Sequence, residues 1–218
     1  MTVQFPIPDY VGARRSMIEN QLRPVGVNDA AVLEAMDSVP REQFVPAEVA
    51  PLAYTDRALA LGGGRFLSGP DVLGQLLTQL APTPGERALV IGVGTGYSAA
   101  VLARIGCQVV GLEADSQLAG RARQLGVETV EGPLEAGYKA RAPYDLILID
   151  GAVERLPDAI IKQLADRGRL GAALVDRRVT RLIVGHKVAG AFGYRSIADA
   201  GVAALPGFAR PQAFQFER

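Results

Sequence analysis

The fold of this chain is decided by residues 87–113, RALVIGVGTGYSAAVLARIGCQVVGLE. Residues 87–91 predict a buried strand, and three glycines follow it within residues 92–96. Tyr97–Ile105 has the apolar spacing of a helix, and Gln108–Leu112 predicts a second strand. A strand, a glycine turn, a helix and another strand form a βαβ unit, which predicts a parallel sheet covered by helices.

The alternation of helices and strands continues after this unit. The patterns predict helices at Ser116–Leu125 and from Pro157 to about Ala165, and strands at Val127–Val130, Asp145–Asp150 and Arg169–Val175. The strand at 145–150 is apolar on both faces, as in a parallel sheet. Arg181–Val188 and Ala213–Phe216 also predict strands, but no strong helix separates every pair. We therefore expect a mostly parallel α/β sheet with an antiparallel C-terminal edge.

The segment before the sheet has a different character. It predicts a helix at Ala13–Leu22, a second helix capped by Asn28-Asp29, and a third from Pro70 to about Leu80. Residues 61–70, LGGGRFLSGP, predict a flexible loop that faces a ligand. The clearest boundary is Pro82-Thr83-Pro84-Gly85. It predicts a helical and loop-forming extension at 1–81 and an α/β domain at 82–218, packed as one compact unit.

Composition limits the classes of partner. The 218 residues include 23 Lys and Arg and 23 Asp and Glu, so the formal charge is zero. A nucleic-acid-binding protein usually has a basic face, so we expect no nucleic-acid partner. No apolar run approaches the roughly twenty residues of a membrane helix, and the N-terminus lacks a signal layout. The single cysteine, Cys107, allows no internal disulfide. We expect a cytoplasmic protein without a membrane partner or a metal site.

The glycine turn predicts a cofactor site. Glycine lacks the Cβ that would keep a ligand from the backbone, and a helix N-terminus offers free N–H groups. The next strand ends at Glu113, about twenty residues on, where a carboxylate can accept hydrogen bonds from two ribose hydroxyls. Dinucleotide enzymes use Gly-x-Gly-x-x-Gly, but the last of those positions is Tyr97 here. A tight turn with no ligand stays open as the alternative.

The tighter spacing resembles class I methyltransferases, which use S-adenosylmethionine as methyl donor. This resemblance implies a Rossmann-like sheet with a helical N-terminal extension. The residues we expect to bind the cofactor are Gly92, Gly94, Thr95, Gly96, Tyr97, Glu113, Ala114 and Asp150.

Further motifs carry a more specific resemblance. They are Gln21-Leu22, Val32-Leu33-Glu34-Ala35-Met36, residues 39–46 (VPREQFVP), Ala53-Tyr54-x-Asp56, Leu61-Gly62-x-Gly64, Ser68-x-Pro70, Ile91–Tyr97, Ala99–Ala103, Pro143-Tyr144-Asp145 and Gln163-Leu164. Together they resemble the protein-L-isoaspartate O-methyltransferase family, from about residue 17 to residue 175.

The resemblance implies an enzyme of protein repair. Such an enzyme methylates the free α-carboxylate of isoaspartyl residues, so its partners are damaged proteins or peptides. Ser68 matches the serine beside the transferred methyl group, and Asp56 and the Gly62–Gly64 loop match segments that line the acceptor site. Arg65 is a cation that could bind the acceptor carboxylate. We expect Ser68, Asp56 and Arg65 to be the catalytic set; the alternative for Ser68 is a helix cap before Pro70.

The chain departs from the family pattern at four places. Arg65-Phe66 replaces Gln-Thr, Val90 replaces an acid that helps hold the cofactor, Gly132-Pro133 replaces Gly-Asp, and Asp150 replaces a small residue or threonine. Asp150 could therefore be an acceptor-binding group or base, or cap the turn at Gly151. These departures leave two alternatives to protein repair. One is a paralogue that methylates another carboxylate or hydroxyl, and the other is a non-catalytic ligand-binding or interaction module of the same fold.

Overall fold

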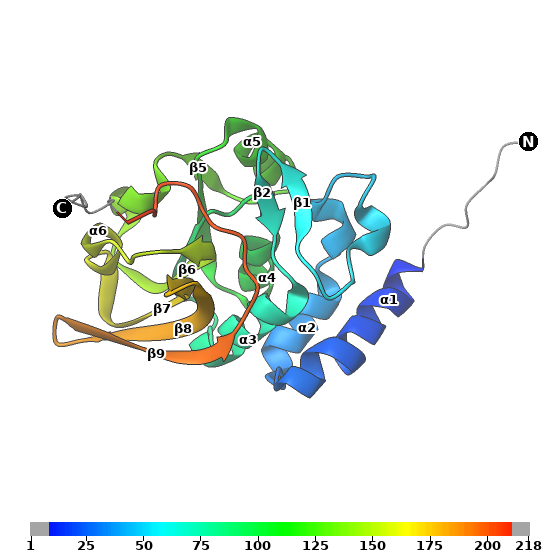
Figure 1. Ribbon diagram of the computed structural model, residues 1–218, viewed down its shortest axis with the longest axis horizontal. Helices are drawn as coiled ribbons and strands as arrows, with labels where there is room; N and C mark the ends of the chain where they lie inside the picture. The colour runs from blue at the N-terminus through cyan, green and yellow to red at the C-terminus, as the bar shows by residue number, and fades with distance from the viewer. Residues whose placement is uncertain (1–8, 211–218) are drawn as a thin grey trace, which may run out of the picture.

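The structure, a computed structural model, describes residues 9–210 (Figure 1). Its centre is a seven-stranded sheet in the order β5-β4-β3-β6-β7-β8-β9. β3, β4, β5, β6 and β7 run parallel, whereas β8 and β9 are antiparallel to their neighbours. The strands are β3 (Arg87–Ile91), β4 (Gln108–Glu113), β5 (Thr129–Glu131), β6 (Tyr144–Val153), β7 (Leu164–Asp176), β8 (Val179–Val188) and β9 (Ala191–Asp199). This confirms the predicted α/β sheet and its antiparallel C-terminal edge.

Helices cover both faces of the sheet, and α1 and α2 lie at one side of the molecule (Figure 1). The α-helices are α1 (Tyr10–Met17), α2 (Ala30–Ser38), α3 (Pro70–Leu80), α4 (Tyr97–Ile105), α5 (Ser116–Gln124) and α6 (Asp158–Ile161). A π-helical turn, Ile18–Leu22, extends α1. The 3-10 turns are Arg23–Val25, Arg41–Phe44, Ala50–Leu52, Leu134–Ala136 and Lys139–Arg141. As predicted, Asp29 caps α2: its carboxylate accepts the Val32 N–H at 3.0 Å.

Alternation along β3 builds a core on each face of the sheet. Ala88 and Val90 belong to the buried cluster that also holds side chains of α1–α4. Leu89 and Ile91 belong to the cluster on the opposite face, together with Leu205. The first cluster joins residues from before and after the Pro82–Gly85 boundary, for example Leu77 and Val90. The division of the chain at residue 82 remains a prediction.

The order of the strands fixes where a ligand can bind. From β3 the chain moves outward to β4 and β5, and then returns to place β6 on the other side of β3. Such a reversal opens a crevice outside the carboxyl ends of the central strands. Gly92 directly follows β3, Glu113 is the last residue of β4, and Asp150 lies in the C-terminal part of β6. The topology thus brings three of the predicted site residues to one edge of the sheet.

One predicted helix was wrong in extent, and one strand was not predicted. The helix expected from Pro157 to about Ala165 ends at Ile161, and Leu164 already begins β7. The cause is pairing with β6: the Tyr144 N–H donates to the Gln163 carbonyl at 2.8 Å, and Leu164 is buried opposite Tyr144. Strand β9 was missed altogether, although it forms a hairpin with β8. The strand predicted at Ala213–Phe216 lies outside the described residues.

The segment predicted as a flexible loop is a short hairpin. β1 (Leu59–Gly62) and β2 (Arg65–Leu67) pair antiparallel, with Leu59 opposite Leu67. Glycines at 62, 63 and 64 form the turn with φ values of 99°, 56° and 73°. Leu59 and Leu67 point inward and are buried, and so is Arg65. The hairpin therefore directs a cation toward the protein interior.

Candidate active site

The glycine turn joins β3 to α4. Gly92, Gly94 and Gly96 have φ values of 74°, 56° and 105°. Gly96 is the N-cap residue of α4, and a Cβ built on it would lie 2.7 Å from a methyl carbon of Val127. Both the backbone conformation and the close neighbour require glycine there. The turn is tied to the next strand because the Gly92 N–H donates to the Leu112 carbonyl at 2.8 Å.

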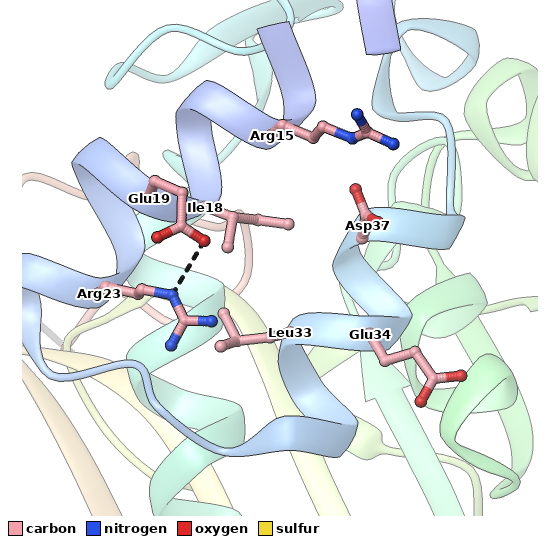
Figure 2. A pocket seen from close by; sticks show the side chains of 7 residues that line it. All are labelled: Arg15, Ile18, Glu19, Arg23, Leu33, Glu34 and Asp37. Atoms are coloured by element: carbon pink, nitrogen blue, oxygen red, sulfur yellow. Dashed lines mark hydrogen bonds and ion pairs between the residues drawn. The ribbon is translucent and has the colours of Figure 1, made fainter. Parts of the chain in front are cut away.

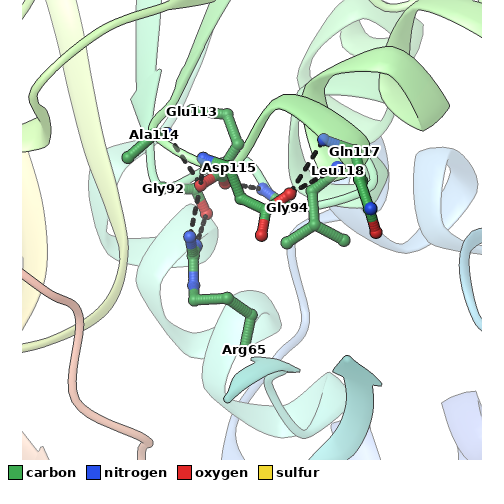
Figure 3. A network of polar contacts seen from close by, with 8 residues as sticks. All are labelled: Arg65, Gly92, Gly94, Glu113, Ala114, Asp115, Gln117 and Leu118. Atoms are coloured by element: carbon green, nitrogen blue, oxygen red, sulfur yellow. Dashed lines mark hydrogen bonds and ion pairs between the residues drawn. The ribbon is translucent and has the colours of Figure 1, made fainter. Parts of the chain in front are cut away.

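Glu113 is held beside this turn by backbone donors (Figure 3). One carboxylate oxygen accepts the Gly94 N–H at 2.7 Å, and the other accepts the N–H groups of Ala114 at 2.8 Å and Asp115 at 3.2 Å. The side chain of Glu113 is fully buried. A carboxylate fixed in this way at the end of β4 has the position of a ribose-binding acid in nucleotide-cofactor folds.

Arg65 reaches the same carboxylate from the hairpin. One nitrogen of its guanidinium forms an ion pair with Glu113, and the other donates to the Gly92 carbonyl at 3.1 Å (Figure 3). The Arg65 residue is only 6% exposed. The predicted role of Arg65 at the acceptor would therefore require the side chain to leave Glu113.

Asp150 lies near these charges in β6. Burial raises the pKa of Asp150, and the Ser98 hydroxyl and the positive charges of Arg65 and Arg41 oppose this rise. Arg65 thus interacts with two carboxylates: it forms an ion pair with Glu113, and its charge also acts on Asp150.

Arg41 connects the glycine turn to the Ser68 segment. It is fully buried, with Nε donating to the Ala53 carbonyl at 2.7 Å and Nη2 donating to the Ser68 carbonyl at 2.5 Å. Its guanidinium carbon lies 4.9 Å from the centre of the Tyr97 ring. A single cation therefore fixes the backbone of Ser68 relative to the first residue of α4.

Two residues predicted to bind the cofactor contact the N-terminal extension. The Thr95 hydroxyl donates to the Phe44 carbonyl at 2.5 Å. The Tyr97 ring packs edge-on against Phe44, with 5.5 Å between ring centres. Their side chains hold the turn against residues 41–44, so the contribution of Thr95 and Tyr97 to cofactor binding remains a prediction.

The predicted acceptor residues are placed differently from one another. Ser68 is buried beside the N-terminus of α3, where the N-cap residue is Gly69 and no side chain forms a capping bond. The helix-cap alternative for Ser68 is therefore wrong. Asp56 is exposed, and its charge and hydrogen bonding add to the effect of burial in raising the pKa of Asp71. The roles of Ser68 and Asp56 in catalysis remain predictions.

Sequence reasoning missed two residues of this region. Arg41 stands in the VPREQFVP stretch, where Glu42 and Gln43 follow it, so the local sequence does not distinguish it from an exposed arginine. Leu205 has no sequence signal. A Cβ built on Gly92 would lie 2.9 Å from both Cδ atoms of Leu205. Leu205 is held there because its N–H donates to the Ala152 carbonyl at 2.8 Å.

Other features of the described residues add no second centre. A hollow of about 370 Å³ lies between α1 and α2 and contains none of the predicted site residues (Figure 2). Residues 9–210 hold no group of three or more His, Cys, Asp or Glu side chains placed to bind a metal ion. Among the helices of this range, none has the length and apolar character needed to cross a membrane.

The sheet order, the glycine turn and the buried acid at the end of β4 define a Rossmann-like methyltransferase fold. A solved structure described as a protein-L-isoaspartate O-methyltransferase superposes with a TM-score of 0.77 at 25% identity, covering 89% of this chain and 66% of that one. A second, from Plasmodium falciparum and described as a complex of such an enzyme with S-adenosyl-L-homocysteine, has a TM-score of 0.77 at 21% identity. It covers 88% of this chain and 97% of that one, and it supports the fold alone.

Sequence comparisons identify the family. Residues 13–192 match the family described as protein-L-isoaspartate(D-aspartate) O-methyltransferase. The protein-L-isoaspartate O-methyltransferase of Methylorubrum extorquens is 45% identical over 171 residues, which are 76% of this chain and 75% of the relative. The Gloeobacter violaceus enzyme of the same name is 41% identical over 177 residues, 76% and 86% of the two chains. This chain belongs to the protein-L-isoaspartate(D-aspartate) O-methyltransferase family, which confirms the predicted family and methyltransferase class.

Proposed function

We propose that this protein transfers a methyl group from S-adenosylmethionine to the free α-carboxylate of isoaspartyl residues in damaged proteins or peptides. The observation that carries the proposal is the Glu113 carboxylate, fixed by backbone N–H groups beside the glycine turn. It stands at the carboxyl end of β4, in a chain whose relatives are named protein-L-isoaspartate O-methyltransferases. The family name supplies the reaction, and Glu113 supplies a group suited to hold the ribose.

The chain supplies the parts that would hold the methyl donor. Glu113 would accept hydrogen bonds from the ribose hydroxyls, and the turn at 92–96 would let the ligand approach the backbone at the N-terminus of α4. Asp150 lies in the C-terminal part of β6, at the same edge of the sheet, where burial raises its pKa and the charge of Arg65 opposes that rise. When bound, S-adenosylmethionine supplies a methyl group on a positively charged sulfur, which an ionised carboxylate can attack without a general base.

The acceptor requires positioning more than activation. A carboxylate is ionised at neutral pH, since its ordinary pKa is about 4. Alignment of the reacting atoms and exclusion of water then account for most of the rate gain. The Ser68 hydroxyl suits the positioning role, because Arg41 fixes the backbone of Ser68. The hydroxyl is also not used as a cap of α3, whose N-terminus has no side-chain capping bond. Burial raises the pKa of Asp71, in the first turn of α3, and Asp56 lies close enough for its charge to add to this rise.

The experiment combines binding and transfer. Calorimetric titration with S-adenosylmethionine should show one site per chain. Labelled methyl groups should then pass to an isoaspartyl peptide and not to the matched aspartyl peptide. Absence of binding near millimolar concentration would remove the methyltransferase proposal, whereas equal labelling of both peptides would remove the repair proposal.

The buried position of Arg65 favours a second candidate. A paralogue that methylates another carboxylate or a hydroxyl would bind the same methyl donor but leave the isoaspartyl peptide unlabelled. Arg65 and Asp150 support it, because they add a cation and an acid to the region where the family pattern has neutral groups. Binding without transfer to either peptide is the result that would select this candidate.

We also place the protein in the cytoplasm. The support is Cys107, which is a free, buried thiol. Burial raises the pKa of Cys107 to about 11, so at neutral pH the thiol stays protonated and unreactive. Fractionation of the source cells, with detection of the protein in the soluble fraction free of periplasmic markers, tests this placement.

A further inference from the structure

We infer that Arg65 occupies the position of the cofactor ribose on Glu113, and that cofactor binding requires this ion pair to break. The inference rests on the proposed function for the identity of the ligand. Arg65, which stands where the family pattern has a neutral residue, thereby lowers the affinity for the cofactor. The relevant contacts are drawn in Figure 3.

The hydrogen bonds to Glu113 are crowded on one of its two oxygens. A carboxylate offers about four acceptor positions, two on each oxygen. In this structure the Arg65 guanidinium and the N–H groups of Ala114 and Asp115 all bond to Oε1, whereas Oε2 accepts only the Gly94 N–H. The backbone donors belong to the glycine turn and to the two residues between β4 and α5, so they cannot leave without unfolding the site. Arg65 is the only one of the four that a side-chain rotation can remove.

The space over the glycine turn is also occupied. The second nitrogen of Arg65 donates to the Gly92 carbonyl at 3.1 Å. A Cβ on Gly92 would meet this nitrogen at 3.2 Å and Leu205 at 2.9 Å, and a Cβ on Gly94 would meet Leu61 at 3.0 Å. Glycine removes side-chain atoms here so that a ligand can approach. In this conformation Arg65, Leu61 and Leu205 take up that approach, and they do so from two separate segments of the chain.

Arg65 lies directly after a turn of three glycines and before Phe66, which is 42% exposed. Its long side chain can carry the guanidinium to solvent while its stem stays on the protein. Such a change separates a buried ion pair, which is costly unless the ligand restores the bonds to Glu113. The affinity is reduced by the fraction of molecules in which Arg65 has moved.

The test compares cofactor binding by the natural protein and by an Arg65→Gln variant. Glutamine keeps part of the side-chain length and removes the charge that holds Glu113. We expect S-adenosyl-L-homocysteine, titrated by calorimetry, to bind Arg65→Gln at least about tenfold more tightly, as for a competent fraction near one tenth. Arg15→Gln is the matched control, because it makes the same change on the exposed face of α1, and its affinity should equal that of the natural protein. Arg65→Met serves as a second variant, which keeps an apolar stem in the same place.

Each outcome decides the inference. Equal or weaker binding by Arg65→Gln overturns it, since Arg65 would then be neutral or a direct ligand of the cofactor. Absence of binding by every form overturns both the inference and the proposed function. Loss of the folded state in both Arg65 variants, seen by circular dichroism, also overturns it, because Arg65 would be a structural requirement. Tighter binding by Arg65→Gln, together with no transfer to the isoaspartyl peptide by the natural protein, would uphold the inference and remove the repair function.

Discussion

Two regions of this molecule meet at one site and differ in how they are built. The βαβ unit at 87–113 places the glycine turn and Glu113 through neighbours that are close in sequence and through parallel pairing of β3 with β4. The hairpin at 59–67 and the segment around Leu205 reach the same place from far along the chain. The glycine turn and Glu113 are therefore positioned by local sequence patterns, whereas Arg65 and Leu205 are brought to them by long-range contacts.

The largest effect should come from breaking the contact between the two regions at Glu113. In Glu113→Gln the buried guanidinium of Arg65 loses its counter-charge. Breaking a buried ion pair by removing one partner costs about 3–5 kcal/mol. We expect urea unfolding to show a loss of this size, together with loss of cofactor binding.

The matched control for Glu113→Gln is Glu128→Gln. Glu128 pairs with Arg141 on the surface, where both side chains are about half exposed. Exposed pairs contribute about 0–1 kcal/mol, so this variant should unfold at nearly the natural urea concentration. Similar losses of unfolding free energy in the two variants would show that the Arg65–Glu113 pair stabilises the protein no more than an exposed pair does.

The next largest effect should come from a change within the glycine turn of the βαβ unit. Gly94 has a φ of 56°, and a Cβ there would lie 3.0 Å from Leu61. A β-branched residue in this conformation costs about 1–3 kcal/mol, and its methyl groups would fill the approach to the backbone. We expect Gly94→Val to reduce cofactor affinity by at least about a hundredfold, equivalent to about 2.8 kcal/mol. Calorimetric titration with S-adenosyl-L-homocysteine measures this loss.

A glycine outside the turn provides the comparison for Gly94→Val. Gly120 lies in α5, and a Cβ there would have no heavy atom within 4 Å. Gly120→Val should therefore leave cofactor affinity unchanged within about twofold. Unchanged affinity in Gly94→Val as well would mean that the cofactor does not approach this turn.

The same contrast explains what could be predicted from the sequence. The bounds of α3, β3 and α4 follow from proline, glycine and apolar spacing, and the structure confirms them. The end of α6 could not be predicted, because Leu164 pairs with Tyr144 of β6. The Tyr144 N–H donates to the preceding carbonyl, that of Gln163. The local pattern around residues 157–165 contains no information about that partner.

The site divides in the same way. Glu113 was predicted because its place at the end of a strand is a local property. The ion pair of Arg65 with Glu113 spans 48 residues, and the position of Leu205 depends on Ala152. No periodicity encodes either contact. The departure from the family pattern at Arg65 did single out the residue, but its partner became evident only in three dimensions.

A smaller effect should separate binding from turnover on the acceptor side. Ser68→Ala removes a hydroxyl while the bond from Arg41 to the Ser68 carbonyl remains. Loss of one positioning hydrogen bond should lower kcat by about tenfold, with the cofactor affinity unchanged. Steady-state transfer to the isoaspartyl peptide measures kcat and KM separately. Ser16→Ala, on the exposed face of α1, is the control, and turnover equal to it would contradict the role of Ser68.

The smallest effect should be the pH dependence of stability that arises from Asp150. Burial raises the pKa of Asp150 in the folded protein, so the folded state holds this proton more tightly than the unfolded chain does. The resulting stabilisation is present below the unfolded pKa, about 3.9, and is lost as the pH rises through the folded value. Asparagine does not titrate. Asp150→Asn should therefore gain stability relative to the natural protein as the pH increases from 4 to 8. Urea unfolding of both proteins across this range measures the difference. A constant difference would mean that Asp150 titrates alike in both states, and that the cations Arg65 and Arg41 offset the effect of its burial.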